Sequence, residues 1–527
     1  MKQSDNTIRP RDGTTHILRN NGAAALVLFV CCLAVASTAQ VFDGLTLYNT
    51  LGGRTTYVIN NSGQTVHSWA SSYSCAYVAY LMPDSSIWRD DVYSGASMRG
   101  ASYGGLIQRY NWDGDIIQSF IWSNTNHQQH HDIHPMDNGH VLVVSWDRKT
   151  AAEAQALGRQ NITSDIWPDE VVEYDPAGDS VVWEWHFWDH LVQDVDSTKL
   201  NYGVVREHPE LLDINLGWVM MGDWMHCNAV DYNKERDEIV VTSHYLDEFY
   251  VIDHSTTTAE AAGHTGGRHG KGGDFLYRWG NPQNYDRGTS SDRVFYVVHG
   301  SNWIPDGYPG AGNIITLNNG DRSGSASDSS SVLELAPPLD SAGNYHIASD
   351  SAFGPTAATW VYSNGKSFYA QHLGGAYRLP NGNTFAILGT SGVVDEITPD
   401  KSVVWTRSLG GQVGKCLKYP SDSAGISENQ ACNVLCRLKS SGPNPFVAAT
   451  SVRYVLPSRS RVALNVVDAT GRIVQRLTDC TQDAGSYAMA FAPGQRLPAG
   501  VYFARLEATP CSGAQMQVVT RVLVKEH

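Results

Sequence analysis

Short runs of alternating apolar and polar residues cover most of the chain, separated by turns rich in Gly, Pro, Asn and Asp. A period of two predicts β-strands rather than helices. One pattern recurs at irregular spacing and consists of two strands around a central turn, with a Trp at the end. Its four copies are YVINNSGQTVHSW (57–69), LIQRYNWDGDIIQSFIW (106–122), VVEYDPAGDSVVWEW (171–185) and VVDEITPDKSVVW (393–405).

Between these copies the pattern predicts hairpins built on a polar or glycine turn. They are YLMPDSSIW (80–88), HHDIHPMDNGHVLVVS (130–145), a hairpin at His226, HGSNWIPDGYPGAGNIITL (299–317) and HLGGAYRLPNGNTFAIL (372–388). A hairpin and a strand pair together give four strands, the size of a propeller blade. Five such sets are present, and a sixth forms if the strands near Leu45–Leu47 and 57–69 close against the segment after Trp405. We therefore predict an all-β chain with a six-bladed β-propeller over residues 40–437.

The hairpin at His226 lies within residues 223–253, DWMHCNAVDYNKERDEIVVTSHYLDEFYVID. Strands are predicted at Met225–Val230 and Ile239–Ser243, because β-branched residues fill the second and residues 233–236 are polar. A turn centred on Glu235 places His226 opposite His244, with Cβ atoms about 5 Å apart. Two unpaired imidazoles rarely fill a core, so this pair indicates a functional site.

Two insertions, residues 190–222 and 254–274, exceed ordinary loop lengths. Unstructured loops this long are often functional covers over a site, although a solvated surface excursion remains an alternative. The glycine-rich segment GHTGGRHGKGGD (263–274) lacks the GK[ST] sequence and the strand-to-helix context of a phosphate-binding loop, so we interpret it as a loop.

The two ends of the chain differ in composition from its middle. Arg9, Arg11 and Arg19 precede an apolar run that ends in Ser-Thr-Ala at 37–39, which is typical of a secretory signal peptide over residues 1–39. No other segment could span a bilayer, so we expect no membrane span in the mature chain. From residue 441 onward, nine Lys/Arg stand against five Asp/Glu, and four alternating strands (451–456, 462–468, 501–506 and 518–524) predict a small Ig-like β-sandwich over residues 438–527.

Charge and cysteine content restrict the partners and the compartment. The net charge of −15 argues against nucleic acid or an anionic membrane as a partner. Seven cysteines remain after the signal, and export permits disulfides, which leaves at least one of the seven unpaired. The first pairs to test are Cys416 with Cys432 or Cys436, and Cys480 with Cys511.

Histidine recurs at the start of the predicted hairpins, at His131 (or His130), His226, His299 and His372. Equivalent positions in successive blades converge on the channel of a propeller, so we expect one shared site. Imidazoles without paired carboxylates suit nucleophilic transfer of an anionic group, or metal binding. The run His127-x-x-His130-His131-x-x-His134 is weak evidence for zinc, because alternation places 130, 132 and 134 on one strand face and 131 and 133 on the other. We predict no metal and no cofactor.

Several segments together resemble the bacterial arylsulfate sulfotransferases: HHDIHPMDNG, DWMHCNAVDYN, YLDEFYVIDHSTTTAEAAGHTGG, GGDFLYRWGNPQNYDRG and GNIITLNNGDR. The resemblance covers most of residues 45–410. It implies an exported six-bladed propeller that transfers a sulfuryl group from a phenolic sulfate ester to a phenolic acceptor through a sulfohistidine, by a ping-pong reaction independent of PAPS. It also implies that His299 is the nucleophile and that His131 and His226 bind the sulfuryl oxygens.

The sequence departs from the pattern of this family at two places. The family has Arg where this chain has His244, and its nucleophile is usually flanked as Gln-His-Asp, whereas Val298 and Gly300 flank His299 here. A guanidinium is always charged, while an imidazole is only partly protonated near neutral pH. Arg322 or Arg268 could supply the missing charge.

Our predicted catalytic residues are His299, His226, His131 and His244, and we expect His130, Asn228, His372 and Arg322 to contact substrate. The alternatives are a non-catalytic propeller that binds aryl sulfates or glycans, and a metal-dependent hydrolase on the same scaffold. The C-terminal region resembles the sorting domain of type IX secretion substrates. The segments that carry this resemblance are GPNPF (442–446), YVLP (454–457), DATGR (468–472), LPAGVYFARL (497–506) and RVLVK (521–525). That resemblance implies secretion machinery as a partner and a secreted or cell-surface location reached through the periplasm.

Overall fold

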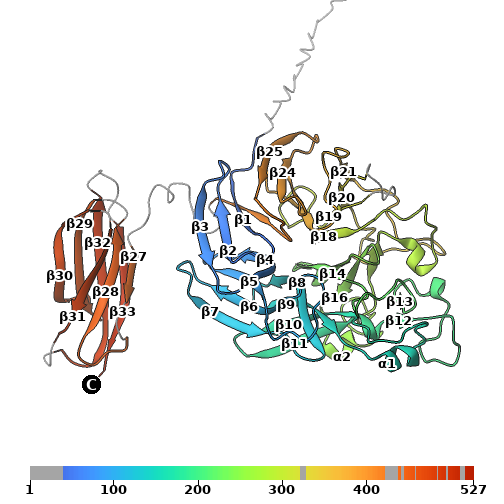
Figure 1. Cartoon of the computed structure of the whole chain (residues 1–527), viewed down its shortest axis with the longest axis horizontal. Coiled ribbons are helices and arrows are strands. Elements are labelled where there is room, and N and C mark those ends of the chain that lie inside the picture. Colours follow the sequence, from blue (N-terminus) through green and yellow to red (C-terminus); the bar gives the residue numbers. More distant parts are fainter. Residues whose placement is uncertain are drawn as a thin grey trace, which may run out of the picture. The chain divides into compact units, whose positions relative to one another are not determined.

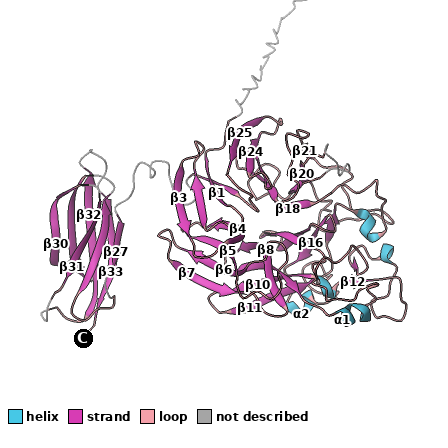
Figure 2. Cartoon of the chain, in the orientation of Figure 1, coloured by secondary structure: helices cyan, strands magenta, loops and turns pink. Residues whose placement is uncertain are grey.

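A computed structural model describes residues 40–320, 328–421, 437–440, 444–456, 459–483, 485–493, 497–510 and 517–526 (Figure 1). Strands dominate it, and helices are few and short (Figure 2). Residues 44–420 form six antiparallel four-stranded sheets. From the innermost strand outward, the first three are β26 (Leu417–Pro420), β1 (Gly44–Asn49), β2 (Thr55–Ile59) and β3 (Thr65–Ala70); β4 (Cys75–Leu81), β5 (Ile87–Val92), β6 (Gly105–Tyr110) and β7 (Ile116–Ile121); and β8 (His127–Pro135), β9 (Val141–Asp147), β10 (Asp169–Asp175) and β11 (Ser180–His186).

The other three sheets follow in chain order around the ring. They are β14 (Cys227–Asn233), β15 (Glu238–Ser243), β16 (Glu248–Asp253) and β17 (Tyr277–Trp279); β18 (Val298–Trp303), β19 (Ile314–Asn318), β20 (Ser331–Leu335) and β21 (Trp360–Tyr362); and β22 (Gly374–Arg378), β23 (Thr384–Leu388), β24 (Val393–Ile397) and β25 (Val403–Ser408). A buried apolar cluster lies between each pair of neighbouring sheets, including the sixth and the first. The predicted all-β fold is confirmed, and its four-stranded sheets are arranged like those of a propeller.

The ring closes by pairing the end of the propeller with its beginning. β26 pairs with β1 in antiparallel register from Gly44↔Pro420 to Leu47↔Leu417. The first blade therefore takes its innermost strand from after Trp405, as the sequence predicts. Two buried ion pairs accompany this closure, Lys418 Nζ to Glu396 Oε2 and Lys415 Nζ to Asp132 Oδ2, each at 2.7 Å.

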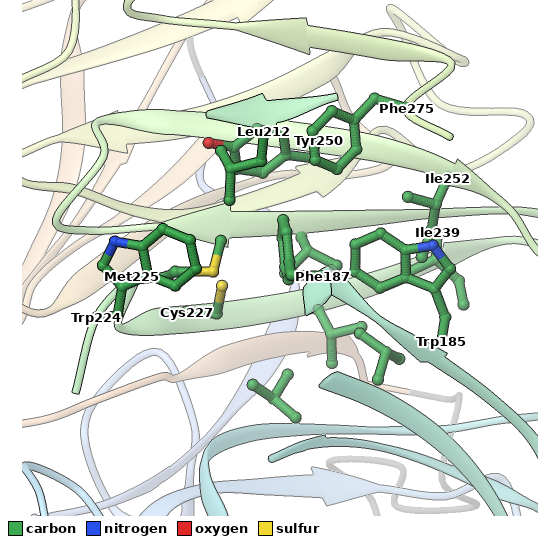
Figure 3. Packing of buried hydrophobic residues seen from close by; sticks show 14 of the residues in the cluster. Trp185, Phe187, Leu212, Trp224, Met225, Cys227, Ile239, Tyr250, Ile252 and Phe275 are labelled. Carbon is green, nitrogen blue, oxygen red and sulfur yellow. The ribbon is translucent and has the colours of Figure 1, made fainter. Parts of the chain in front are cut away.

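The two predicted insertions pack against the ring as mostly irregular segments. The first contains the short strands β12 (Leu191–Val192) and β13 (Leu212–Asp213) and η2 (Val205–Glu207), and it follows η1 (Phe187–Asp189). The second contains α2 (Thr258–Ala261), which has a capping box at its start, as does α1 (Ala151–Ala156) in the β9–β10 connection. Figure 3 shows Leu212 of the first insertion among the apolar side chains around Trp185, Tyr250 and Phe275. The first insertion is thus anchored through the apolar core beside the fourth blade.

The C-terminal region forms two sheets around its own buried cluster. One has the order β27 (Arg437–Ser440), β28 (Thr450–Leu456) and β31 (Gly485–Phe491), and the other has the order β30 (Ile473–Gln482), β29 (Ser460–Asp468), β32 (Gly500–Pro510) and β33 (Gln517–Lys525). Side chains from both sheets, such as Tyr454 and Leu464, share one apolar cluster. The four predicted strands are present, and β27, β30 and β31 were not predicted.

Two sets of sequence predictions concern residues beyond those described. The signal segment 1–39 lies outside the described residues, as do Cys432, Cys436 and Cys511 of the predicted disulfides. Cys75, Cys227, Cys416 and Cys480 carry free thiols. Among the described residues, we find no helix that is both long and apolar enough to cross a membrane.

Candidate active site

A continuous row of imidazoles runs across three neighbouring blades. Ring centroids are 4.5 Å apart between His131 and His226, 5.1 Å between His226 and His244, and 4.9 Å between His244 and His299. His131 belongs to β8, His299 belongs to β18, and the two histidines between them flank the β14–β15 hairpin. The structure therefore brings the four predicted catalytic residues together.

Bulges in the innermost strands direct these rings to one place. The ladder register shifts between Gln129 and Ile133 in β8, between Cys227 and Ala229 in β14, and around Gly300 in β18. His131 and His226 have positive φ values of 51° and 54°, a left-handed conformation that non-glycine residues rarely adopt. Bulges re-aim side chains next to active sites, and local strain of this kind gathers at functional positions.

The bulge in β14 also explains why His226 faces His244. Most of the hairpin pairs with the register Asn233↔Glu238, which centres the turn half a residue later than predicted. The extra residue at Asn228 restores the pairing Cys227↔Ser243 at the open end of the hairpin. His244 N donates to His226 O at 3.2 Å, so the predicted opposition of the two histidines is confirmed.

His299 is held in one tautomer by a buried amide. Asn319 Nδ2 donates to Ala370 O at 3.0 Å and to Leu373 O at 2.9 Å, which leaves Asn319 Oδ1 as the acceptor facing His299 Nδ1 at 2.8 Å. Nδ1 therefore carries the proton and Nε2 carries the lone pair. Leu373 N donates to this lone pair at 3.2 Å. Burial lowers the pKa of His299 to about 3, so the ring is neutral near pH 7.

The rings of His131 and His244 are also neutral before an anion binds. Burial lowers the pKa of His131 well below its usual range, and the nearby His226, His130, His299 and His244 lower it further. For His244 the pKa is likewise well below its usual range, first through burial and then through His299, His226 and His372. His244 Nδ1 is out of contact with solvent and has no hydrogen-bond partner in the described part of the chain.

His226 is oriented by a carboxylate that the sequence analysis did not single out. Asp223 Oδ2 lies 2.5 Å from His226 Nδ1, and Asp223 Oδ1 accepts from Trp146 Nε1 at 3.2 Å. The acid stands only three residues before His226 in DWMH, so its spacing was the available signal. Tyr245 stacks on the imidazole of His226 at 4.6 Å between centroids.

The residues predicted to contact substrate occupy different environments. The ring of His130 stacks on Trp146 at 4.1 Å between centroids, and its Nδ1 lies 2.8 Å from His131 Nδ1. His130 therefore helps to orient the ring of His131. Asn228 is fully buried, with Nδ2 donating to Val298 O at 2.8 Å and Oδ1 accepting from Gly300 N at 3.3 Å. Its amide therefore fixes β18. The half-buried His372 lies close enough to lower the pKa of His244 and His299.

Neither arginine suggested as a replacement for the family guanidinium is placed at the row. Arg322 lies outside the described residues. Arg268 donates to Arg236 O in the β14–β15 turn at 2.6 Å, which is the opposite end of the hairpin from His226 and His244. The suggestion that Arg268 compensates for His244 is therefore wrong.

The histidine run of β8 does not converge on one point, because the bulge breaks the alternation. His127 Nδ1 pairs with Glu170 at 2.9 Å and His134 Nδ1 with Asp231 at 3.1 Å, while His131 joins the row. Two groups of residues outside the row bring possible metal-ligating atoms within 4.8 Å of one another. They are His127, Asp147 and Glu170, and His190, His264 and Asp274.

Known proteins resemble this chain at two levels, in a protein-family model and in solved structures. The protein-family model for arylsulfotransferase (ASST) matches residues 94–407, more than half of the chain. Comparison with curated proteins gives no significant match. Similar solved structures include a protein of unknown function from Bacteroides caccae (10% identity, TM-score 0.39, covering 71% of this chain and 98% of that one) and a putative 6-phosphogluconolactonase from Bacteroides fragilis (7%, 0.35, 72% and 99%).

A further similar structure is the β-propeller domain of Cps50 from Myceliophteria thermophila, with 9% identity, a TM-score of 0.35, and coverage of 72% of this chain and 90% of that one. TM-scores this low support no inference about activity. The family match stands independently of them and covers the third to fifth blades in full, almost all of the sixth blade and the two outer strands of the second. The chain belongs to the arylsulfotransferase (ASST) family and is an aryl sulfotransferase.

Proposed function

We propose that the enzyme carries the sulfuryl group on His299 Nε2 between a phenolic sulfate ester and a phenolic acceptor. The observation that carries this proposal is the fixed tautomer of His299, whose Nδ1–H faces Asn319 Oδ1 while Nε2 presents its lone pair beside three further imidazoles. A neutral imidazole with a defined lone pair is a competent nucleophile at neutral pH. No other ring in the row has both nitrogens assigned in this way among the described residues.

In the first half-reaction, Nε2 attacks sulfur, the N–S bond forms, and the sulfur–oxygen bond to the aryl group breaks. The aryl oxide leaves with the bonding electron pair and takes up a proton. In the second half-reaction, the oxygen of an acceptor phenol attacks the same sulfur, its proton is released, and the N–S electron pair returns to His299. Donor and acceptor therefore use one site in turn.

Charge on the transferred oxygens is met by the remaining rings and by one backbone amide. His131, His226 and His244 line the row beside His299, and the unpartnered Nδ1 of His244 is available to an anion. Asp223 holds the ring of His226 in place through its contact with Nδ1. The Leu373 N–H, which must release Nε2 before attack, then faces the incoming group. Pre-positioned donors of this kind stabilise a transition state by about 2.7–4 kcal/mol each.

The test is sulfuryl loading from a donor without an acceptor. Incubation with 4-nitrophenyl sulfate alone should add the mass of one sulfuryl group per chain and release one equivalent of 4-nitrophenol. His299→Ala should do neither, while the exposed His346 provides a matched histidine-to-alanine control that should load normally. Loading that survives in His299→Ala would move the nucleophile to another ring.

The same experiment separates the two other candidate functions. A propeller that only binds aryl sulfates or glycans takes up no sulfuryl group and releases no phenol. A metal-dependent hydrolase releases sulfate, and its activity falls after dialysis against a chelator.

We also propose that the protein is exported. The motifs of residues 442–525 and the apolar run within residues 1–39 support passage through the periplasm, with the C-terminal sandwich addressing the chain to a type IX secretion machinery and to the cell surface or medium.

A further inference from the structure

A turn in the first insertion presents large apolar side chains to solvent close to the imidazole row. Trp218 is 64% exposed, Met221 is 80% exposed and Met220 is 38% exposed. Single exposed apolar residues need no explanation, but three within four positions form a small patch. Its position beside Asp223, which holds His226, places this patch at the site.

Hydrogen bonds fix the backbone on both sides of this patch. Before it, Arg159 donates to Leu216 O at 2.7 Å and to Gly217 O at 3.1 Å, and Trp224 Nε1 donates to Leu216 O at 2.8 Å. After it, Met220 and Asp223 exchange two backbone hydrogen bonds of 2.9 and 3.0 Å.

The turn between Met220 and Asp223 has positive φ at both central residues, 55° at Met221 and 99° at Gly222. A two-residue turn of this kind is tight, and its first central residue, Met221, is exposed. Trp167 N also donates to Gly222 O at 2.7 Å. The exposed side chains therefore sit on a fixed backbone rather than on a free loop.

Three rings lead from the row to this patch in nearly parallel orientation. Tyr245 stacks on His226 with centroids 4.6 Å apart and planes at 28°, and Trp218 stacks on Tyr245 with centroids 6.3 Å apart and planes at 23°. Offset-stacked rings at these separations attract one another and other aromatic rings. The thioether of Met221 adds a flexible, polarisable neighbour.

We propose that Tyr245, Trp218 and Met221 form the binding platform for the aryl ring of both donor and acceptor. The proposal rests on sulfuryl transfer at His299, because the oxygen-bearing edge of the ring must reach the row while its face needs an apolar partner. The row supplies the polar contacts, and Tyr245, which touches both His226 and Trp218, connects the two parts of the site. Because donor and acceptor use one site in turn, one platform serves both.

Binding can be measured apart from transfer. In a His299→Ala background, 4-nitrophenyl sulfate and methyl sulfate are titrated by calorimetry. Adding Trp218→Ala should raise the Kd of the aryl ester about three- to tenfold, which corresponds to about 0.7–1.4 kcal/mol and to the strength of one ring pair. The Kd of methyl sulfate, which has no ring, should stay unchanged. Trp218→Phe should restore most of the aryl affinity.

Leu200→Ala is the matched control, since Leu200 is a fully exposed apolar residue of the same insertion. It should change neither Kd. In the otherwise wild-type enzyme, Trp218→Ala should raise KM for the donor and for a phenol acceptor by similar factors. An unchanged Kd for the aryl ester, or an equal loss for methyl sulfate, overturns the platform. Absence of sulfuryl loading in the wild type, with ring-dependent binding intact, overturns only the proposed transfer.

Discussion

Replacing His244 by Arg should raise the transfer rate at neutral and alkaline pH. The residue lies between His226 and His299, and its pKa is held well below 6.5 by burial and by three neighbouring imidazoles. Taking 6.5 as an upper limit, at most about one tenth of His244 is protonated at pH 7.5, so forming the cation costs at least about 1.4 kcal/mol. An arginine carries the charge without this cost.

The expected gain at pH 7.5 is therefore tenfold or more, and it shrinks as the pH falls and wild-type His244 becomes protonated in the anion complex. The wild-type rate should decline as pH rises, because deprotonation removes a donor to the sulfuryl oxygens. His244→Ala should lower the rate across the whole range by about 10²–10³, the scale of a lost oxyanion donor.

The assay is release of 4-nitrophenol from 4-nitrophenyl sulfate with phenol as acceptor, between pH 5.5 and 8.5. Ratios of variant to wild type at each pH cancel the ionisation of the acceptor. His244→Gln, which keeps a neutral donor of similar reach, separates the charge from the hydrogen bond. Arg and Ala variants that both match the wild type at every pH would refute the reasoning, because His244 would then not contact the transferred group.

Three further predictions concern stability and export. The stability lost through His299→Gln, relative to wild type, should be about 2 kcal/mol smaller at pH 5 than at pH 7.5. The reason is that His299 of the unfolded wild type takes up a proton below pH 6.5, whereas native His299, with a pKa of about 3, does not, so the wild type itself is less stable at pH 5. Urea unfolding at both pH values measures this difference, and an equal loss at the two values contradicts it. Lys415→Met should destabilise the propeller by about 3–5 kcal/mol, because Asp132 is left as an unpaired buried acid, and the double variant with Asp132→Leu should recover most of the loss in thermal unfolding. Deleting residues 441–527 should leave a folded, active propeller in the periplasm, as judged by cell fractionation; a truncated protein that still reaches the surface contradicts the sorting assignment.

Much of the fold could be predicted because alternation and turn residues are local signals. The strand pairs, the hairpins and the closing of the ring by the segment after Trp405 follow from them. The bulge at Asn228 could not, since one extra residue in a strand leaves the pattern of apolar residues almost unchanged. It nevertheless determines that His226 meets His244, and the simple count of residues around Glu235 reached the correct pair although most of the hairpin has another register.

The site was predictable only as a set of histidines. Their partners depend on contacts between segments that are far apart in the sequence. Asn319, which fixes the tautomer of His299, follows the end of β19, and Tyr245 stacks on Trp218 of the first insertion. Asp223 could have been noticed from its spacing to His226. The hydrogen bonds of Asn228 with the backbone of β18 could not be predicted either, because they join two different blades.

The pairing of β26 with β1 determines when the nascent chain can complete its folding. Residues 44–70 emerge from the ribosome early, yet the strand that completes their blade follows almost the whole propeller sequence. Contacts so distant in sequence form late and slowly. Until Lys415 and Lys418 have been synthesised, Asp132 and Glu396 lack their cationic partners. An incomplete ring is therefore destabilised by these two acids as well as by its missing strand. The ring therefore cannot close before residue 420 has been synthesised, which keeps the nascent chain open for the passage across a membrane that we propose.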